Sequence, residues 1–418
     1  METGTTVKFS PDTPQRVVVK GYDWGMGLCT AILTLEQPAA PEAVNAGIFE
    51  QVVEERESFD WETFQPEHIV IRGPRTVRDA YVCSPDGARS TQPDRSVRVE
   101  FACTPATTPA CFDLHKQRSS WCDPYRLLYT VNGETFAPPV DLSHARLPQL
   151  EPFCMEQSFT GSEGRTLKYA YYEPEEAKAA PGKKLPLVIW LHGAGEGGTN
   201  TFLPLLGNKA TALASPEFQQ AMGGAAYLLV PQTNGFWMEY DAPDTWAQNP
   251  GKPSVYTKTL KELIDAFVAA HPAVDADRIL LCGCSNGGYM SLNIALQYPE
   301  RFAAVAPICE AYRDAGISDA ELVRIKDLPL WFVYAKNDDV VPPEEYEEPT
   351  IARLRAMGAD LRVSVFEDVH DRYGMTDPKT GAPWQFSGHW SWVYFFNNAC
   401  IDPVSGEHIW SWMGRQKR

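Results

Sequence analysis

The feature that most constrains the fold is a glycine-flanked serine between an apolar run and an uncharged segment. Residues 278–282 form the apolar run, and Gly-Cys-Ser-Asn-Gly follows directly at 283–287. Residues 287–298 then carry no charged side chain. A buried strand that turns at once into a buried helix leaves little room for side chains at the turn, which explains the glycines. The sequence therefore predicts a sharp strand–turn–helix unit with Ser285 at its tip.

From about residue 155 onward, apolar strand patterns alternate with helical patterns. Mostly buried strands are expected at residues 185–191, 225–230, 278–282, 303–308, 328–334 and 361–366. Between the second and third of these, apolar residues follow the spacing of an amphipathic helix, at Leu260, Leu263, Ile264, Phe267 and Val268. This alternation predicts the α/β class, with a doubly wound sheet.

The first 150 residues show a different pattern, with short β-type runs at 29–35, 68–72 and 96–101. Asn132-Gly133 separates two further runs and indicates a hairpin. Because no long helical periodicity appears, an all-β sandwich of immunoglobulin-like type is expected. Residues 141–152 contain two prolines and indicate a linker. The predicted domains are residues 1–150 and 151–418.

Composition limits the partners and the compartment. The net charge of −17 argues against nucleic acid or an anionic membrane as main partner. No apolar run approaches the ~20 residues of a membrane-spanning helix, and the first residues lack the apolar stretch of a signal peptide. Ten scattered cysteines then indicate reduced thiols and a cytoplasmic protein. Cys103, Cys111 and Cys122 lack the paired spacing of a structural zinc site, so no metal or cofactor is assigned.

A serine at such a turn is raised above the carboxyl edge of the sheet and is a candidate nucleophile. The alternative is an incidental serine in a glycine-rich turn, but the strand before and the helix after favour the nucleophile elbow. Serine needs a base and an orienting acid, which follow it in the chain order Ser, acid, His in this fold class. Asp338, directly after the strand at 328–334, is the predicted acid, with Asp339 and Glu310 as weaker alternatives.

Three histidines follow Ser285 and are candidates for the base. His408 lies in a C-terminal segment expected to form a surface helix. His370 directly follows the strand at 361–366, where a base is often found. His389 lies in a Gly-His pair followed by aromatic residues, which suits a loop histidine aimed into a site. This favours His389 as the base, and His370 stays as the alternative or as a substrate contact.

The loop at residues 192–198, His-Gly-Ala-Gly-Glu-Gly-Gly, follows the strand at 185–191 and is the expected oxyanion loop. The backbone N–H groups of Ala194 and Asn286 are the predicted donors. The same glycines also match a dinucleotide-binding fingerprint. However, no convincing helix follows the loop and the acidic ribose-binding signal is missing, so the oxyanion reading is preferred.

With these motifs, residues 155–415 resemble the α/β-hydrolase superfamily, and within it the esterases near poly(hydroxybutyrate) depolymerases, feruloyl esterases and prolyl-oligopeptidase-like hydrolases. In such esterases the Gly-His-x-x-Trp element, here at 388–392, carries the base, which supports His389. Residues 21–25, Gly-Tyr-Asp-Trp-Gly, resemble the immunoglobulin-like domain before some bacterial esterases. Cys284 departs from the commoner small residue before the serine.

The resemblance implies a serine carboxylic-ester hydrolase acting on small or aromatic esters, including feruloyl or acetyl esters linked to plant sugars. Phe236, Trp237 and Trp246 are candidate walls of the substrate site or, equally, packing residues. One alternative is a serine peptidase of prolyl-oligopeptidase type, which would need a propeller that 150 residues without repeats cannot form. The other is a glycan-binding protein with an inert hydrolase fold. Neither the ester specificity nor the oligomeric state follows from the sequence.

Overall fold

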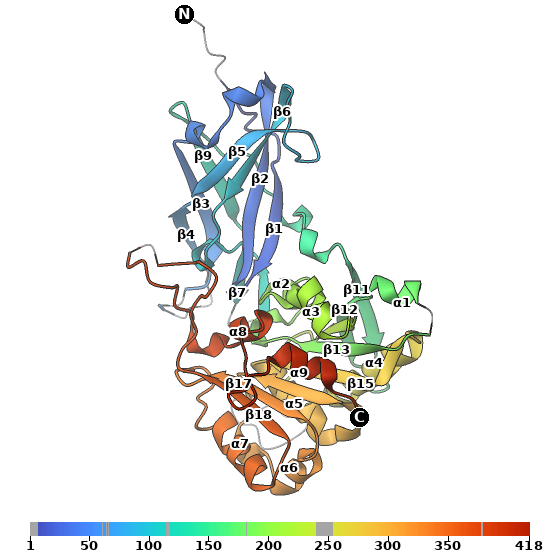
Figure 1. Cartoon of the computed structure of the whole chain (residues 1–418). Helices are drawn as coiled ribbons and strands as arrows, with labels where there is room; N and C mark the ends of the chain where they lie inside the picture. Colours follow the sequence, from blue (N-terminus) through green and yellow to red (C-terminus); the bar gives the residue numbers. More distant parts are fainter. Residues whose placement is uncertain are drawn as a thin grey trace, which may run out of the picture. The chain divides into compact units, whose positions relative to one another are not determined.

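The computed structural model describes residues 7–60, 62, 63, 65, 67–113, 118–180, 182–239, 254–377 and 379–418. The chain divides into two compact units, Met1–Glu151 and Pro152–Arg418 (Figure 1). Each unit has its own sheets and its own apolar core. Among the described residues, no helix combines the length and the apolar character that crossing a bilayer requires.

The first unit is built from β-strands. Two four-stranded sheets have the orders β1-β2-β6-β5 and β10-β9-β3-β4, and β7 and β8 form a separate pair. The strands are β1 (Arg16–Tyr22), β2 (Gly25–Ala39), β3 (Gln51–Ser58), β4 (Ile69–Pro74), β5 (Val77–Cys83), β6 (Asp94–Phe101), β7 (Ala110–Asp113), β8 (Arg118–Trp121), β9 (Tyr125–Val131) and β10 (Glu134–Phe136). The expected hairpin is β9–β10. The all-β character is thus as expected, while the immunoglobulin-like type stays a prediction.

The second unit contains one eight-stranded sheet in the order β11-β12-β14-β13-β15-β16-β17-β18. Its strands are β11 (Phe153–Thr160), β12 (Thr166–Tyr172), β13 (Leu185–Leu191), β14 (Tyr227–Gln232), β15 (Val274–Cys284), β16 (Ala304–Ile308), β17 (Leu330–Ala335) and β18 (Leu361–Phe366). The strands from β14 to β18 pair in parallel, whereas β11 and β12 are antiparallel additions at one edge. All six strands expected from the sequence are present, within a few residues of the expected bounds.

Helices cover both faces of this sheet. They are α1 (Glu175–Ala179), α2 (Leu203–Leu206), α3 (Pro216–Ala221), α4 (Thr257–Ala270), α5 (Asn286–Gln297), α6 (Asp319–Ile325), α7 (Glu347–Ala356), α8 (Trp392–Phe396) and α9 (Ile409–Arg415). On one face, α4 and α5 share a buried apolar cluster with β13, β15 and β17. On the other, Trp190 of β13 packs on Phe396 of α8, and Trp331 of β17 packs on Trp412 of α9. Two covered faces explain why β13 and β17 are apolar throughout.

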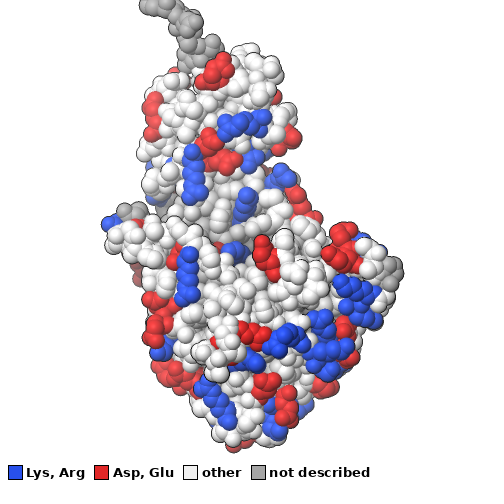
Figure 2. Space-filling model, viewed as in Figure 1, with Lys and Arg blue, Asp and Glu red and all other residues white. Residues whose placement is uncertain are grey.

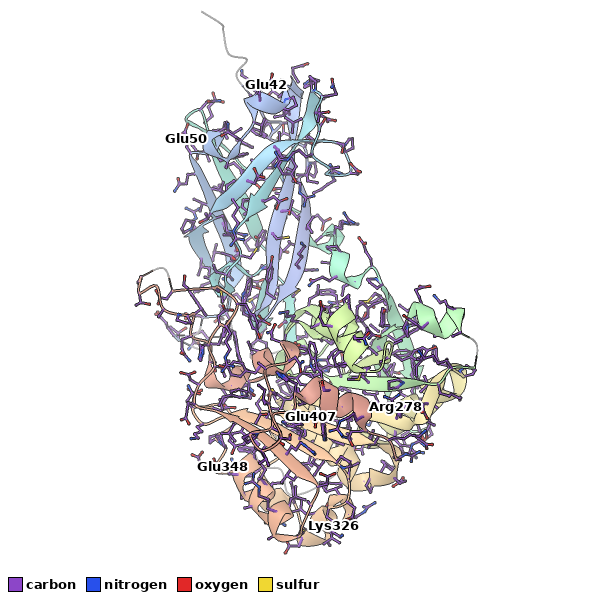
Figure 3. All side chains as sticks on the ribbon, in the orientation of Figure 1. Glu42, Glu50, Arg278, Lys326, Glu348 and Glu407 are labelled. Atoms are coloured by element: carbon purple, nitrogen blue, oxygen red, sulfur yellow. The ribbon has the colours of Figure 1, made fainter. Side chains whose placement is uncertain are left out.

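The C-terminal segment differs from the expected surface helix. Helix α9 buries Ile409, Trp410, Trp412 and Met413. Arg278, labelled in Figure 3, donates from Nη2 to the carbonyl of Gly414 at 2.6 Å and so ties α9 to β15. The burial of α9 was not predicted, because seven residues are too few to show an apolar periodicity. Its packing also depends on β17, which is distant in the sequence.

Helix α5 approaches β13 so closely that Gly287 has no space for a side chain. A Cβ at Gly287 would lie 2.0 Å from the backbone oxygen of Leu191. We therefore expect Gly287→Ala to lower the free energy of unfolding by about 1–3 kcal/mol, because overpacking against backbone outweighs the helix preference of alanine, which is worth about 1 kcal/mol. Urea unfolding monitored by circular dichroism measures this change.

Gly235→Ala is the matched control, because nothing lies within 4 Å of its ideal Cβ. It should change stability by less than about 0.5 kcal/mol. Equal stability of Gly287→Ala and the control would contradict the close approach.

Candidate active site

Ser285 sits between β15 and α5 with a strained backbone, at φ 54° and ψ −117°. A positive φ is unusual for a residue with a side chain and costs of order 1–3 kcal/mol unless the surroundings enforce it. Here the enforcing contacts are backbone ones. The N–H of Ser285 donates to the carbonyl of Ile308 at 2.9 Å, and Gly283 and Gly287 lie too close to neighbouring backbone for any Cβ. Strand, turn and helix thus match the geometry expected for an elbow.

His389 and Asp338 form a buried pair in the structure. His389 Nδ1 lies 2.7 Å from Asp338 Oδ2, and the two residues are 7% and 4% exposed. The other carboxylate oxygen, Oδ1, accepts the N–H groups of Val340 and Val341, both at 2.9 Å. The turn after β17 therefore fixes the carboxylate and leaves one oxygen for the imidazole. A carboxylate at Nδ1 favours the tautomer in which Nε2 is free to accept a proton.

The glycine before His389 is required by the close contact between two loops. A Cβ at Gly388 would lie 2.3 Å from the backbone oxygen of Asn337, so only glycine lets the histidine loop contact the loop that carries the acid. Ser387 caps the short 3₁₀ turn Gly388–Trp390 by accepting the N–H of His389 at 3.3 Å. The edge of the His389 ring packs against Trp392. These contacts hold the imidazole beside Asp338.

His370, the alternative base, is held by other partners. Its Nδ1 lies 2.6 Å from Asp368 Oδ1, and its backbone N–H donates to the hydroxyl of Tyr394 at 3.1 Å. Its side chain is 35% exposed, against 9% for His389. Because His370 contacts Asp368 instead, the histidine that the structure places beside Asp338 is His389. Glu310, the alternative acid, is fully buried and accepts the N–H of Tyr312 at 2.6 Å.

The expected oxyanion loop follows β13 and begins with a buried histidine. His192 Nδ1 lies 2.7 Å from the carbonyl of Gly193, and Nε2 accepts the N–H of Thr233 at 3.2 Å. Burial lowers the pKa of His192 to about 4, so the ring is neutral and bridges the loops after β13 and β14. Ala194 begins the 3₁₀ turn Ala194–Glu196, and Asn286 begins α5. The first N–H groups of a helix lack partners within it, which suits the role expected for Asn286.

Glu196 is a residue of this site that the sequence did not single out. It is 8% exposed, and its Oε2 accepts the N–H of Gly193 at 2.8 Å and the Nδ2 hydrogen of Asn208 at 3.4 Å. Burial raises its pKa to about 8. Asn208 also lies 3.1 Å from Cys284 Sγ, so this network joins the oxyanion loop to the residue before the serine. An acidic residue inside a glycine-rich run is the only sequence signal for it.

The three aromatic residues proposed as walls differ in position. Trp237 is fully buried, with its ring against His192 and Tyr256, and its backbone N–H donates to Asn286 Oδ1 at 2.6 Å. The side chain of Trp237 is therefore part of the core, so Trp237 is a packing residue and not a wall of the substrate site. Phe236 is half-buried on the loop after β14, and Trp246 lies outside the described residues.

Comparisons with known proteins identify the family and the fold of this chain. Residues 160–417 match the model of the esterase family described as "Putative esterase". A solved structure described as a thermostable esterase is 20% identical, with a TM-score of 0.69 over 97% of this chain and 100% of that chain. This likeness confirms the predicted fold class. Acyl-protein thioesterase 1 of Schizosaccharomyces pombe is 36% identical over 84 residues. That match covers 20% of this chain and 37% of the relative.

The buried state of Glu196 predicts a pH dependence of stability. Its folded pKa of about 8 lies above the usual glutamate value of 4.5. The folded state thus keeps the proton that the unfolded state loses, and the stabilisation present below pH 4.5 is lost as pH rises toward 8. Glu196→Gln cannot ionise, so it should lose less stability than wild type between about pH 6 and pH 9. Urea midpoints at both pH values measure this.

The exposed Glu344→Gln is the matched control and should follow wild type at both pH values. A Glu196→Gln variant that loses as much stability as wild type would show that Glu196 is already ionised in the folded state.

The pairing of Asp338 with His389 predicts which histidine is essential. His389→Ala should lose as much kcat on an aryl ester as Ser285→Ala does, and the double variant should be little worse, because residues acting as one unit are non-additive. His370→Ala should cost about 10-fold or less, as expected for a group that only positions its neighbours. Steady-state kinetics on the four variants decide between them. Collapse of His370→Ala with near-normal turnover of His389→Ala would reverse the assignment.

Proposed function

Since the chain belongs to the esterase family, we propose that it hydrolyses carboxylic esters through an acyl-enzyme formed on Ser285. The observation that carries the proposal is the buried His389–Asp338 pair at the same sheet edge as the strained Ser285. Ser285 Oγ attacks the acyl carbonyl, and His389 Nε2 takes its proton and returns it to the leaving alcohol. Asp338 holds the Nδ1–H and stabilises the imidazolium. The same groups then activate water for deacylation.

The developing oxyanion is stabilised by backbone N–H groups in this proposal. Asn286 supplies one donor from the first turn of α5, and Ala194 supplies the other from the turn after β13. His192 and Glu196 position the second donor, because each holds Gly193, the residue directly before Ala194. Removal of one such donor typically costs about 10²–10³-fold in kcat.

Small or aromatic esters, including feruloyl and acetyl esters of plant sugars, are the substrates that we propose. Between β16 and β17, where lipases often insert a cap, the chain forms only a 3₁₀ turn and the seven-residue helix α6. Phe236 is a half-buried aromatic on the loop after β14 and is the proposed contact for an aromatic acyl group. A prolyl-oligopeptidase reading is disfavoured, because the first unit consists of sheets of two and four strands without repeated blades.

The surface and the thiols support a small-molecule substrate and a cytoplasmic location. On the face seen in Figure 2, acidic and basic side chains are interspersed, and no extended basic patch suited to nucleic acid is visible there. All ten cysteines lie in the described residues and are free thiols. Free thiols in this number are typical of reducing compartments.

The test replaces the nucleophile and varies the ester. Ser285→Ala should lose about 10⁴-fold or more in kcat/KM and should no longer react with a fluorophosphonate probe, while its thermal unfolding stays close to wild type. A panel of acetyl, butyryl, long-chain and feruloyl esters then measures the acyl preference. One tenth of wild-type activity in Ser285→Ala would exclude it as the nucleophile. Labelling of the wild type without turnover of any ester would favour a peptidase, whereas a wild type that the probe does not label would favour a binding protein.

A further inference from the structure

Three potential metal ligands meet in the first unit, two of them 11 residues apart and the third 43 residues further along the chain. Glu57 lies on β3, His68 directly precedes β4, and Cys111 lies on β7. One ligand atom of each lies within 4.8 Å of the other two, with His68 Nδ1 and Cys111 Sγ 3.8 Å apart. Cys111 is 3% exposed, and the side chains of His68 and Glu57 are 13% and 18% exposed. The cluster is thus largely shielded from water.

His68 faces a carboxylate at each ring nitrogen. Nδ1 contacts Glu57 Oε1, and Nε2 lies 3.2 Å from Oδ2 of Asp113, whose side chain is 5% exposed. Within the described residues, the buried Nε2 makes no hydrogen bond of acceptable geometry. A neutral imidazole carries one N–H and can donate to only one of the two carboxylates. The second nitrogen therefore needs either an extra proton or a cation.

We propose that Glu57, His68 and Cys111 bind a zinc ion through Oε1, Nδ1 and Sγ, with water as the fourth ligand. Zinc–nitrogen bonds of about 2.0–2.1 Å and zinc–sulfur bonds of about 2.3 Å place the N and S atoms of a tetrahedral site roughly 3.5 Å apart. The observed 3.8 Å between Nδ1 and Sγ is close to that separation, whereas Nδ1 and Oε1, which are in direct contact, must move apart for the ion to enter. Carboxylate, imidazole and thiolate together form a donor set that suits zinc.

Asp113 completes the arrangement without binding the metal. A histidine that binds zinc through one nitrogen almost always donates its other N–H to a carboxylate, carbonyl or water. Asp113 Oδ2 stands at that position beside Nε2. Glu57 is also oriented, because its Oε2 accepts the N–H of Asp123 at 2.9 Å. Cys122 is not a ligand in this proposal, since its thiol lies 3.4 Å from the carbonyl of Glu57 and donates there.

The zinc ion would have a structural role. Strands β3 and β4 belong to a four-stranded sheet, whereas β7 belongs to the separate pair β7–β8. Hydrogen bonds within that pair involve few residues, so a metal bridge from β7 to β3 and His68 would anchor it. Binding energy at a structural zinc site adds directly to the stability of the folded state.

The experiment measures zinc on the full chain. Wild-type protein, stripped with a chelator and dialysed against excess zinc, should retain about one zinc per chain by elemental analysis, with a higher Tm than the stripped protein. Cobalt should give a thiolate-to-cobalt charge-transfer band in the near ultraviolet. Cys111→Ser should lose the band and His68→Gln should lose the zinc. Asp113→Asn should weaken zinc affinity about 10- to 100-fold, as expected for a residue that orients a ligand.

Cys29→Ser is the matched control, because it removes a half-buried thiol of the same unit outside the cluster. It should keep both the zinc and the cobalt band. Wild-type protein that retains no zinc and gives no cobalt band would overturn the proposal and leave the cluster as a metal-free contact of His68 with two carboxylates, even if the Cys111 variant fails to fold. Equal zinc retention by wild type and a folded Cys111→Ser would overturn the ligand set.

Discussion

The candidate active site depends on how closely helix α5 approaches strand β13. A Cβ at Gly287 would overlap the backbone of Leu191 and His192, and a Cβ at Gly283 would overlap Gly287 in turn. Glycine at both positions lets the strand turn into the helix within one residue, and that residue, Ser285, is forced to a positive φ. The strain is held at Ser285, the proposed nucleophile, because the last six residues of β15 and nearly all of α5 are buried. The loop after β13 consequently lies beside the first turn of α5, where two backbone donors can face one oxyanion.

Buried ionisable groups surround this site, and burial keeps their neutral forms stable. It raises the pKa of Glu196 and of Glu310 to about 8, and raises that of Glu347 well above its usual range. His192 is neutral for the same reason, with its pKa lowered to about 4. A charged carboxylate beside the loop after β13 would repel a developing oxyanion. In the proposed mechanism, holding Glu196 protonated at neutral pH avoids that repulsion, so that the N–H groups dominate the local field.

Local patterns account for much of what the sequence predicted. Strand β13 was predicted at its observed bounds because it is a continuous apolar run covered on both faces, and β18 was predicted at its bounds from alternating apolar residues. Strands β11 and β12 form the antiparallel edge of the sheet and were not predicted. Their residues are partly buried and partly exposed, so their sequence pattern does not differ clearly from that of the linker before them. Glu196 could not be predicted as buried, because its environment is built by Asn208 and Gly193 after folding. The same limit applies to Trp237, whose aromatic character fits a wall and a core equally well.

Both clusters of chemically active side chains are assembled from segments distant in sequence, yet only one could be read from the sequence. Asp338 and His389 follow parallel strands, and the carboxyl ends of parallel strands meet at one edge of the sheet. In a parallel sheet, residues that follow different strands therefore lie close together in space. For this reason the chain order Ser, acid, His predicts which residues meet. Glu57 of β3 and His68, just before β4, are brought together by the pairing of these two strands, whereas Cys111 comes from β7 of another sheet, and no rule relates its chain position to theirs. A search for closely spaced pairs of cysteine and histidine passes over this set, because its histidine and its cysteine are 43 residues apart.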